Sequence, residues 1–275
     1  MNLDCLITVD DTSNDLKKDT TKAELSEIPA EFRQNPGRCA STLYDLVAEG
    51  ADKSNLAQYE HFSYKNELKQ FISLMPKGGV IIDLGCGLGF EVTYFAKLGF
   101  EAYGLDISEK SIELARELFP HLNFIKGDFS DFTIYEKLKV DGIHEHLSLM
   151  NLPKEDIERL LERFYSLSKN GGLLQVSFEE DIPEKTGWYA VPVSKTVKWK
   201  EKLVRVGGFI HFSYYTYDEL KKTIQQSGFN ILSVSSYFEK GLSRKTLTIL
   251  CQKKRNYLQG LYLKIKEEVK RFFED

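Results

Sequence analysis

VIIDLGCGLGF, residues 80–90, is a short apolar run that leads into three alternating glycines. The run is typical of a buried strand, and the glycines stand directly before a helical pattern. Because these glycines carry no side chain, backbone amides in the turn can approach a ligand closely. A dinucleotide fold needs a further glycine where this chain has Phe90, since its pyrophosphate sits on the helix N-terminus. The turn therefore favours a ligand that lacks a pyrophosphate.

Outward from this turn, short apolar runs alternate with helical stretches. The runs are EAYGLD, NFIKGD, DGIHEHL and GGLLQVSF, and the stretches between them include SEKSIELARELF and KEDIERLLERFYSLSK. This alternation predicts right-handed βαβ units and an α/β fold whose parallel sheet is covered on both faces. Thr216 and Glu219 then form a capping box that opens a helix, and NILSVSSYF and KTLTILCQ predict a hairpin after it. The hairpin gives the sheet an antiparallel edge.

Two carboxylates end the strands that follow the glycine turn. Asp106 closes the second strand, where a carboxylate can accept hydrogen bonds from both hydroxyls of a ribose. Asp128 closes the third strand, where it can accept from the exocyclic amine of adenine, with Phe129 against the ring. Each has a plainer interpretation, Asp106 as a helix cap and Asp128 as a turn former. In one register at three successive strand ends, the glycines and the carboxylates together predict a nucleoside ligand.

In these motifs the sequence resembles the class I, Rossmann-like S-adenosylmethionine-dependent methyltransferases, and in particular their small-molecule subgroup. The resemblance runs from about Tyr44 to Lys253, and its most specific parts are DLGCGLG at 83–89, GLDIS at 104–108 and GD at 127–128. It implies S-adenosylmethionine as the cofactor, with Asp83 and the glycine backbone near its methionine moiety. The cofactor-binding residues that we predict are Tyr44, Asp83, Gly85, Cys86, Gly87, Gly89, Asp106, Ile107, Asp128, Phe129 and His144.

The resemblance also implies a seven-stranded, mostly parallel, doubly wound sheet in the order 3-2-1-4-5-7-6, with strand 7 antiparallel. We expect the methyltransferase domain to span residues 41–253, with helices at its N-terminal side and a lid insertion at 181–212. Residues 1–40 are polar and weakly periodic, and we expect them to form an N-terminal arm or lid.

The fourth predicted strand reads DGIHEHLSLMNLP at 141–153 and resembles the pattern D-G-I-x-x-x-x-S-L-x-H-x-P of that subgroup, with Asn151 in place of the common histidine. Since this strand ends facing the methyl group in the family, His144, Glu145 and His146 are our catalytic candidates. Alternation along a strand places His144 and His146 on one face and Glu145 on the other. The alternatives are a structural histidine or a carboxylate that orients the donor's ammonium group. An H-x-H metal site lacks an evident third ligand, so no metal is predicted.

A long insertion, DIPEKTGWYAVPVSKTVKWKEKLVRVGGFIHFSYY at 181–215, holds both tryptophans of the chain. Loops at this edge of the family fold cover the acceptor, so its aromatic side chains are candidate walls of a substrate pocket. The alternative is that they pack the insertion against the sheet. The substrate-binding candidates are Trp188, Tyr189, Trp199, His211, Tyr214 and Tyr215, with Tyr59, His61, Phe62 and Tyr64 from the N-terminal side.

Composition and charge bound the class of protein. A hydrophobic content of 42% and an aromatic content of 12% are ordinary for a globular chain, and a net charge of −4 does not favour binding to a polyanion. The four cysteines form no CxxC pair, and the N-terminus shows no leader pattern, so we expect a cytoplasmic protein. No apolar stretch approaches the roughly 20 residues that a transmembrane helix needs.

The C-terminal segment 254–275 has an apolar stripe at helical spacing with lysines opposite. This pattern favours an amphipathic helix that docks on the core or joins two copies in a homodimer, and a helix on a membrane surface is the alternative.

Three functions remain open on the sequence. The first is methyl transfer from S-adenosylmethionine to oxygen, nitrogen or carbon of a small metabolite or natural product by in-line displacement. The second is an RNA methyltransferase acting on tRNA, because KTVKWKEKLVRVGG interleaves lysines with Trp199 and Arg205. The third is a non-catalytic subunit that binds S-adenosylmethionine.

Overall fold

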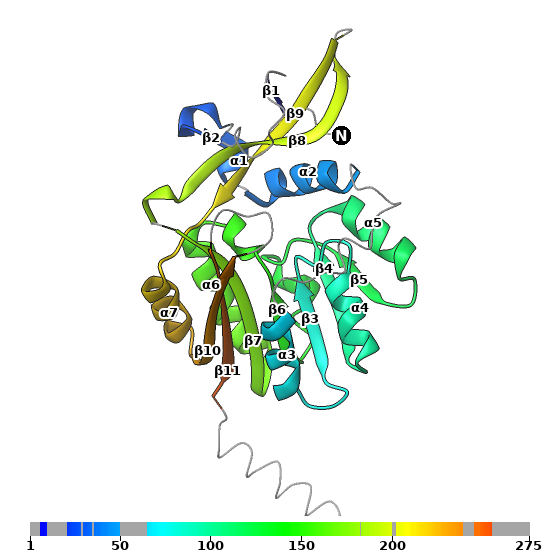
Figure 1. Ribbon diagram of the computed structural model, residues 1–275, viewed down its shortest axis with the longest axis vertical. Helices are drawn as coiled ribbons and strands as arrows, with labels where there is room; N and C mark the ends of the chain where they lie inside the picture. The colour runs from blue at the N-terminus through cyan, green and yellow to red at the C-terminus, as the bar shows by residue number, and fades with distance from the viewer. Residues whose placement is uncertain are drawn as a thin grey trace, which may run out of the picture.

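A computed structural model describes residues 6–9, 21–28, 30–34, 36–49, 65–181, 183–199, 202–238 and 245–254 of the chain (Figure 1). For residues 6–9, 21, 27, 31, 32, 38, 183, 192–199 and 202–207 it describes the backbone alone. The α-helices are α1 (Ala30–Gln34), α2 (Pro36–Glu49), α3 (Lys65–Leu74), α4 (Phe90–Lys97), α5 (Glu109–Leu118), α6 (Lys154–Leu167) and α7 (Tyr217–Gln226). Short 3-10 turns include η4 (Phe132–Ile134) and η5 (Leu149–Asn151). Tyr59 and Tyr64, with the neighbouring His61 and Phe62, lie outside the described residues, as do the Trp199 side chain and residues 255–275.

The main sheet has seven strands in the order β10-β11-β7-β6-β3-β4-β5. Its strands are β3 (Val80–Leu84), β4 (Glu101–Asp106), β5 (Asn123–Lys126), β6 (Val140–Glu145), β7 (Ser168–Glu180), β10 (Phe229–Phe238) and β11 (Lys245–Lys253). Strands β5, β4, β3, β6 and β7 pair in parallel, whereas β11 is antiparallel to both β7 and β10. The predicted order 3-2-1-4-5-7-6, with its last strand antiparallel, is confirmed.

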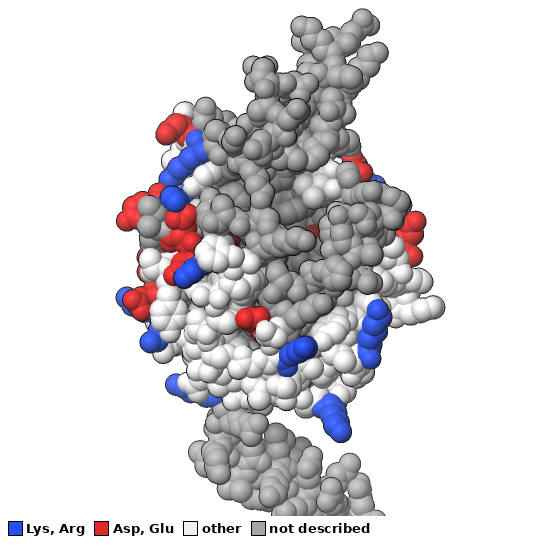
Figure 2. All heavy atoms as spheres, in the orientation of Figure 1, with Lys and Arg blue, Asp and Glu red and all other residues white. Residues whose placement is uncertain are grey.

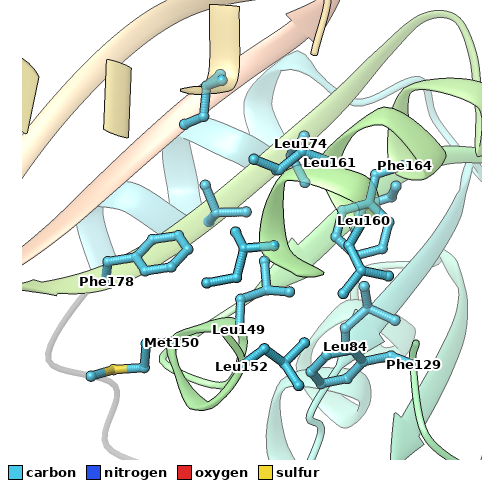
Figure 3. Close-up of a cluster of buried hydrophobic side chains, with 14 of the residues drawn as sticks. Leu84, Phe129, Leu149, Met150, Leu152, Leu160, Leu161, Phe164, Leu174 and Phe178 are labelled. Atoms are coloured by element: carbon cyan, nitrogen blue, oxygen red, sulfur yellow. The ribbon is translucent and has the colours of Figure 1, made fainter. Parts of the chain in front are cut away.

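Both faces of this sheet are buried, because successive residues of its strands enter different cores. Ile82 packs in one cluster with α6 and α7, while its neighbour Ile81 packs in another with α3, α4 and α5. Figure 3 shows part of the first cluster, in which side chains of α6 lie against the turn around η5 and against Phe129. The capping box predicted at Thr216 and Glu219 begins α7 with both of its hydrogen bonds present. This is the two-faced burial that the near-continuous apolar runs predict.

A second sheet, in the order β1-β9-β8-β2, was not predicted. The insertion supplies β8 (Gly187–Trp199) and β9 (Lys202–Phe212), and the N-terminal segment adds β1 (Leu6–Val9) and β2 (Thr21–Lys22) at the two edges. Helix α2 lies between this sheet and the rest of the molecule, in contact with β8, β9 and α5 (Figure 1). It begins at Pro36, within the segment 1–40 that we expected to form an arm or lid. Through the pairing of β1 with β9 and of β2 with β8, strands of the predicted arm and of the predicted lid insertion form one sheet.

Within the described residues, no helix is both long enough and apolar enough to cross a membrane.

Candidate functional site

A cavity of about 230 Å³ opens at the carboxyl ends of β3, β4, β5 and β6, under α2. Parallel strands place their carboxyl ends along one edge, so residues far apart in the sequence meet there. Its lining residues are Gly37, Ala40, Tyr44, Gly85, Gly87, Asp106, Ile107, Ser111, Asp128, Phe129, His146, Leu147, Ser148, Asn151 and Leu152. A second hollow of about 300 Å³ adjoins it and shares Tyr44, Gly85, Gly87 and Ser111.

The glycine turn after β3 has a backbone that favours glycine. Gly85 and Gly87 have φ angles of 74° and 50°, in the left-handed region. A Cβ on Gly85 would collide with the side chain of Ser148, whereas one on Gly87 would meet no atom within 4 Å. The turn is thus packed on its Gly85 side and open at Gly87, where a ligand can approach the backbone.

Asp106 ends β4 at the centre of the cavity. Its two carboxylate oxygens accept hydrogen bonds from the backbone amides of Gly87 and Ser108, each at 2.8 Å. These bonds fix the carboxylate without using all of its lone pairs. Burial raises the pKa of Asp106, and the two amides oppose that effect.

Asp128 and Gly37 meet at the β5 side of the cavity. Asp128 accepts a hydrogen bond of 2.8 Å from the backbone amide of Ser130. Asp128 and Gly37 also line a third hollow, of about 440 Å³, that continues outward between α6 and η4. A Cβ on Gly37 would lie 2.4 Å from a carboxylate oxygen of Asp128. The first turn of α2 therefore approaches this carboxylate as closely as a glycine allows.

The three catalytic candidates at the end of β6 separate in the structure. His144 is buried on the face of the sheet that α3 and α4 cover, where its ring packs against Phe71 and Phe95. Its Nδ1 lies 2.6 Å from a carboxylate oxygen of Asp83. His146 lines the cavity. Placing both histidines on one face was wrong, because β6 ends at Glu145 and alternation does not extend to His146. Burial lowers the pKa of His144, and its interactions with Asp83 raise it. The net effect is a raised pKa.

Glu145 supports the loop that follows β6. Its side chain is fully buried and accepts backbone amides of Ser148, Leu149 and Ser177. Burial raises its pKa to about 7 despite these three donors. Leu147, beside it, has a φ of 60°, the positive angle that the tight turn requires. Glu145 does not line the cavity, so its role in the structure is to hold the turn.

Asn151, at the end of η5, joins the cavity to α2. Its Nδ2 donates a hydrogen bond of 2.7 Å to the hydroxyl of Tyr44. Burial raises the pKa of Tyr44 to about 12, so the phenol stays neutral. The sequence singles out Asn151 only as a departure from a family pattern. Ser148 matches the serine of the same pattern, whereas Gly37, Ala40, Leu147 and Leu152 carry no comparable signal, because only the fold brings them to the cavity.

Among the predicted cofactor residues, seven line the main cavity and Cys86 lines the adjoining hollow. The seven are Tyr44, Gly85, Gly87, Asp106, Ile107, Asp128 and Phe129. Asp83, Gly89 and His144 line neither: Asp83 holds His144, and Gly89 caps α4 with a φ of 81°. Within the described residues, no group of three metal-binding side chains comes together.

The insertion aromatics pack into the core instead of lining this cavity. Trp188 contacts the ring of His211 edge to face and belongs to a small cluster with Ile28 and Cys39. Tyr189, Tyr214 and Tyr215 belong to the main core, at 8% exposure or less. Burial lowers the pKa of His211 to about 4. The burial of these described side chains is what the packing alternative expects, and the prediction that the insertion forms pocket walls stays a prediction.

Comparisons with known proteins agree with this geometry. Residues 81–172 match a family model described as a methyltransferase domain. The chain is 23% identical over 147 residues to a demethylmenaquinone methyltransferase of Chlorobaculum tepidum, covering 53% of this chain and 58% of that protein. It is 29% identical over 129 residues to phosphoethanolamine N-methyltransferase 1 of Zea mays, covering 45% of this chain and 25% of that protein. The alignments thus span about half of the first relative and a quarter of the second.

Among solved structures, a 1,6-didemethyltoxoflavin-N1-methyltransferase of Burkholderia thailandensis, with its substrate and S-adenosylhomocysteine bound, has the same fold. The TM-score is 0.57 at 16% identity, over 85% of this chain and 93% of that one. The likeness therefore extends well beyond the segment matched by the family model.

Proposed function

We propose that this chain, which belongs by its domain and its fold to the class I S-adenosylmethionine-dependent methyltransferases, transfers a methyl group from S-adenosylmethionine to a small molecule. The observation that carries the proposal is the convergence of three strand ends on one cavity. The cavity is lined after β3 by Gly85 and Gly87, at the end of β4 by Asp106, and after β5 by Asp128 and Phe129.

Each strand end suits one part of the donor. The Asp106 carboxylate, fixed by two amides and turned into the cavity, can accept both ribose hydroxyls. Asp128 can accept the adenine amine beside the ring of Phe129, and the open backbone at Gly87 leaves room for the methionine end. The residues present therefore fit the donor along its whole length.

When bound, S-adenosylmethionine supplies a methyl group activated on a sulfonium. The chain itself positions, encloses and desolvates the reacting atoms. Since the donor's sulfur end would lie by the β3 turn, the loop after the neighbouring strand β6 would face the methyl group with the residues that line the cavity, His146, Leu147, Ser148, Asn151 and Leu152. Among the three catalytic candidates, this position favours His146, which lines the cavity, for any proton transfer that the acceptor requires.

The distribution of charge on the described surface favours a small acceptor over a nucleic acid. In Figure 2, basic side chains of the described surface are scattered singly over the face in view, without a continuous stripe that could follow a nucleic-acid backbone. The basic stretch KTVKWKEKLVRVGG, on which the RNA alternative depends, falls at residues 195–208, whose side chains up to residue 207 lie outside the description.

Label transfer from donor to acceptor tests the proposal. Purified protein is incubated with methyl-labelled S-adenosylmethionine and a cell extract divided into small-molecule, RNA and protein fractions. We expect label in the small-molecule fraction, and much less transfer by Asp106→Ala at a donor concentration that does not saturate the variant. Label in tRNA would support the RNA alternative, and S-adenosylhomocysteine binding without any transfer would support a non-catalytic subunit.

A further inference from the structure

Asn151 is held rigidly at the wall of the cavity. Met150 and Leu152, on either side of it, accept hydrogen bonds through their carbonyl oxygens from the amide and the hydroxyl of Ser213, at 2.7 and 2.6 Å. The Asn151 amide donates to the Ser148 carbonyl. With the backbone fixed on both sides and Nδ2 bonded to Tyr44, the carboxamide has one orientation.

The carboxamide oxygen of Asn151 is a buried acceptor that is not used by the described residues. The side chain is 6% exposed and lines the cavity, yet its Oδ1 receives no hydrogen bond from the part of the chain that the structure describes. Burying an amide oxygen without a donor is costly, and in native proteins such an atom commonly meets a ligand or a water. The wall of the cavity therefore contains a buried oxygen that calls for an N–H or O–H donor.

The chemistry around this oxygen narrows the kind of donor. The cavity lining contains two carboxylates, Asp106 and Asp128, which the proposed function assigns to S-adenosylmethionine, and the described lining has no lysine or arginine. The described lining of the main cavity thus offers no lysine or arginine to a phosphate or carboxylate acceptor, while Arg159 and Arg163 line the third hollow, on the β5 side. A carboxamide oxygen also accepts a hydrogen bond without removing the proton, because an amide is a very weak base.

We propose that Asn151 determines acceptor specificity: its Oδ1 accepts a hydrogen bond from the N–H of a neutral primary or secondary amine, whose nitrogen receives the methyl group. This inference rests on the proposed function and deepens it by naming the substrate class.

The reaction needs no base at the moment of transfer. The nitrogen lone pair forms the bond to the methyl carbon, and the carbon–sulfur bond breaks with its electron pair remaining on sulfur as S-adenosylhomocysteine. The positive charge passes from sulfur to nitrogen, and the product ammonium releases its proton to water afterwards. Throughout, the N–H stays on the Asn151 oxygen, which directs the lone pair at the methyl group.

Sinefungin provides a probe that does not depend on knowing the acceptor. It carries an amine where S-adenosylmethionine carries the sulfonium methyl, so this amine occupies the position of the transferred methyl itself. We expect the wild-type protein to bind sinefungin about tenfold more tightly than S-adenosylhomocysteine in calorimetry, from one charge-assisted hydrogen bond. The ratio of the two affinities is the readout, because it cancels general damage to the donor site.

Two substitutions at Asn151 and one control distinguish the hydrogen bond from packing. Asn151→Leu should reduce the affinity ratio to about one, since it removes the acceptor at similar volume. Asn151→Asp should keep or increase the ratio, because a carboxylate accepts from the same amine. Asn230→Leu makes the same change at an exposed position on β10, at the other edge of the sheet, and should leave the ratio unchanged.

Three results would overturn the inference. They are an unchanged ratio in a folded Asn151→Leu variant, a wild-type preference for S-adenosylhomocysteine over sinefungin, and a methyl group found on oxygen or carbon of the labelled product by mass spectrometry. Should Asn151→Leu fail to fold, three results still test the inference: the wild-type preference for sinefungin over S-adenosylhomocysteine, the affinity ratio of Asn151→Asp, and the atom that carries the label in the product. A wild-type protein that binds neither ligand would refute the proposed function, and would do so separately from any change at Asn151.

Discussion

The carboxyl edge of the main sheet and the β8–β9 ribbon both hold polar and aromatic side chains, but they use them in different ways. At the carboxyl edge, Asp106 and Asp128 are fixed by backbone amides and face a cavity. In the ribbon, Trp188 and His211 pack against each other and are enclosed. Parallel strands leave their end residues at an open edge, whereas a ribbon that lies on α2 buries one of its faces. Position in the topology, more than residue type, separates binding from packing.

The largest expected effect is a loss of stability on truncating Trp188 in the ribbon, and it tests whether this residue packs or binds. Trp188→Ala should lower the free energy of unfolding by about 3–5 kcal/mol, because it empties a buried aromatic site. Affinity for S-adenosylhomocysteine, measured on the folded fraction, should stay the same. Leu232→Ala, at a position on β10 that is 44% exposed, is the control and should change stability little. A loss of affinity as large as the loss of stability would place Trp188 at the ligand.

His211 gives the ribbon a pH dependence of the opposite sign to that of Asp106 at the carboxyl edge, whose pKa burial raises. Burial lowers its pKa from 6.5 to about 4, so the folded state disfavours the charged ring. Above pH 6.5 the ring is neutral in both states and contributes nothing. As the pH falls towards 4, only the unfolded state takes up the proton, and stability falls by a total on the order of 3 kcal/mol.

The measurement is the difference in unfolding free energy between wild type and His211→Gln across this pH range. Glu145, whose pKa is raised to about 7, acts with the opposite sign, since the folded state binds its proton more strongly. Its contribution is common to both proteins and cancels in the difference. A difference that does not vary between pH 4 and 6.5 would contradict a buried, neutral His211.

Asp106→Ala tests the carboxyl edge. It should weaken S-adenosylhomocysteine binding by about 1.5–3 kcal/mol through lost ribose hydrogen bonds. Asp131→Ala, at an exposed aspartate that caps η4, is the matched control. Equal affinity in Asp106→Ala and wild type, measured by calorimetry, would remove Asp106 from the donor site.

The smallest expected effect lies where the two regions meet. Ser213→Ala removes the hydroxyl that donates to the Leu152 carbonyl at 2.6 Å, and should cost about 1 kcal/mol of stability. Donor affinity should change less than in Asp106→Ala, because the Ser213 amide still holds Met150. Chemical denaturation and calorimetry on the same samples would show the two effects. A larger loss of affinity than of stability would make the junction part of the donor site.

The sequence predicts the main sheet and most of the donor edge because both are encoded locally. Gly85, Gly87, Asp106 and Asp128 stand directly at strand ends, and a strand end in a parallel sheet has a fixed place. The second sheet could not be predicted in the same way. Strand β1 has only four residues and β2 only two, and each pairs with a strand far away in the sequence, β9 and β8 respectively.

The end of β6 shows why the candidate acceptor side is harder to predict than the donor side. Strand alternation holds for His144 and Glu145 but stops where the strand does, so the direction of His146 depends on the turn at Leu147. That turn is fixed by the buried Glu145, whose pattern of amide partners has no sequence signature. Likewise, the aromatics of the insertion look the same in sequence whether they wall a pocket or fill a core.

A crystal structure of the protein with S-adenosylhomocysteine tests most directly whether a nucleoside lies across the ends of β3, β4 and β5. We predict the ribose hydroxyls on Asp106, the adenine beside Phe129 and Asp128, and the sulfur facing Asn151 and His146. Density for the ligand elsewhere, or NAD bound across these strand ends in a protein that does not take up S-adenosylhomocysteine, would contradict this arrangement.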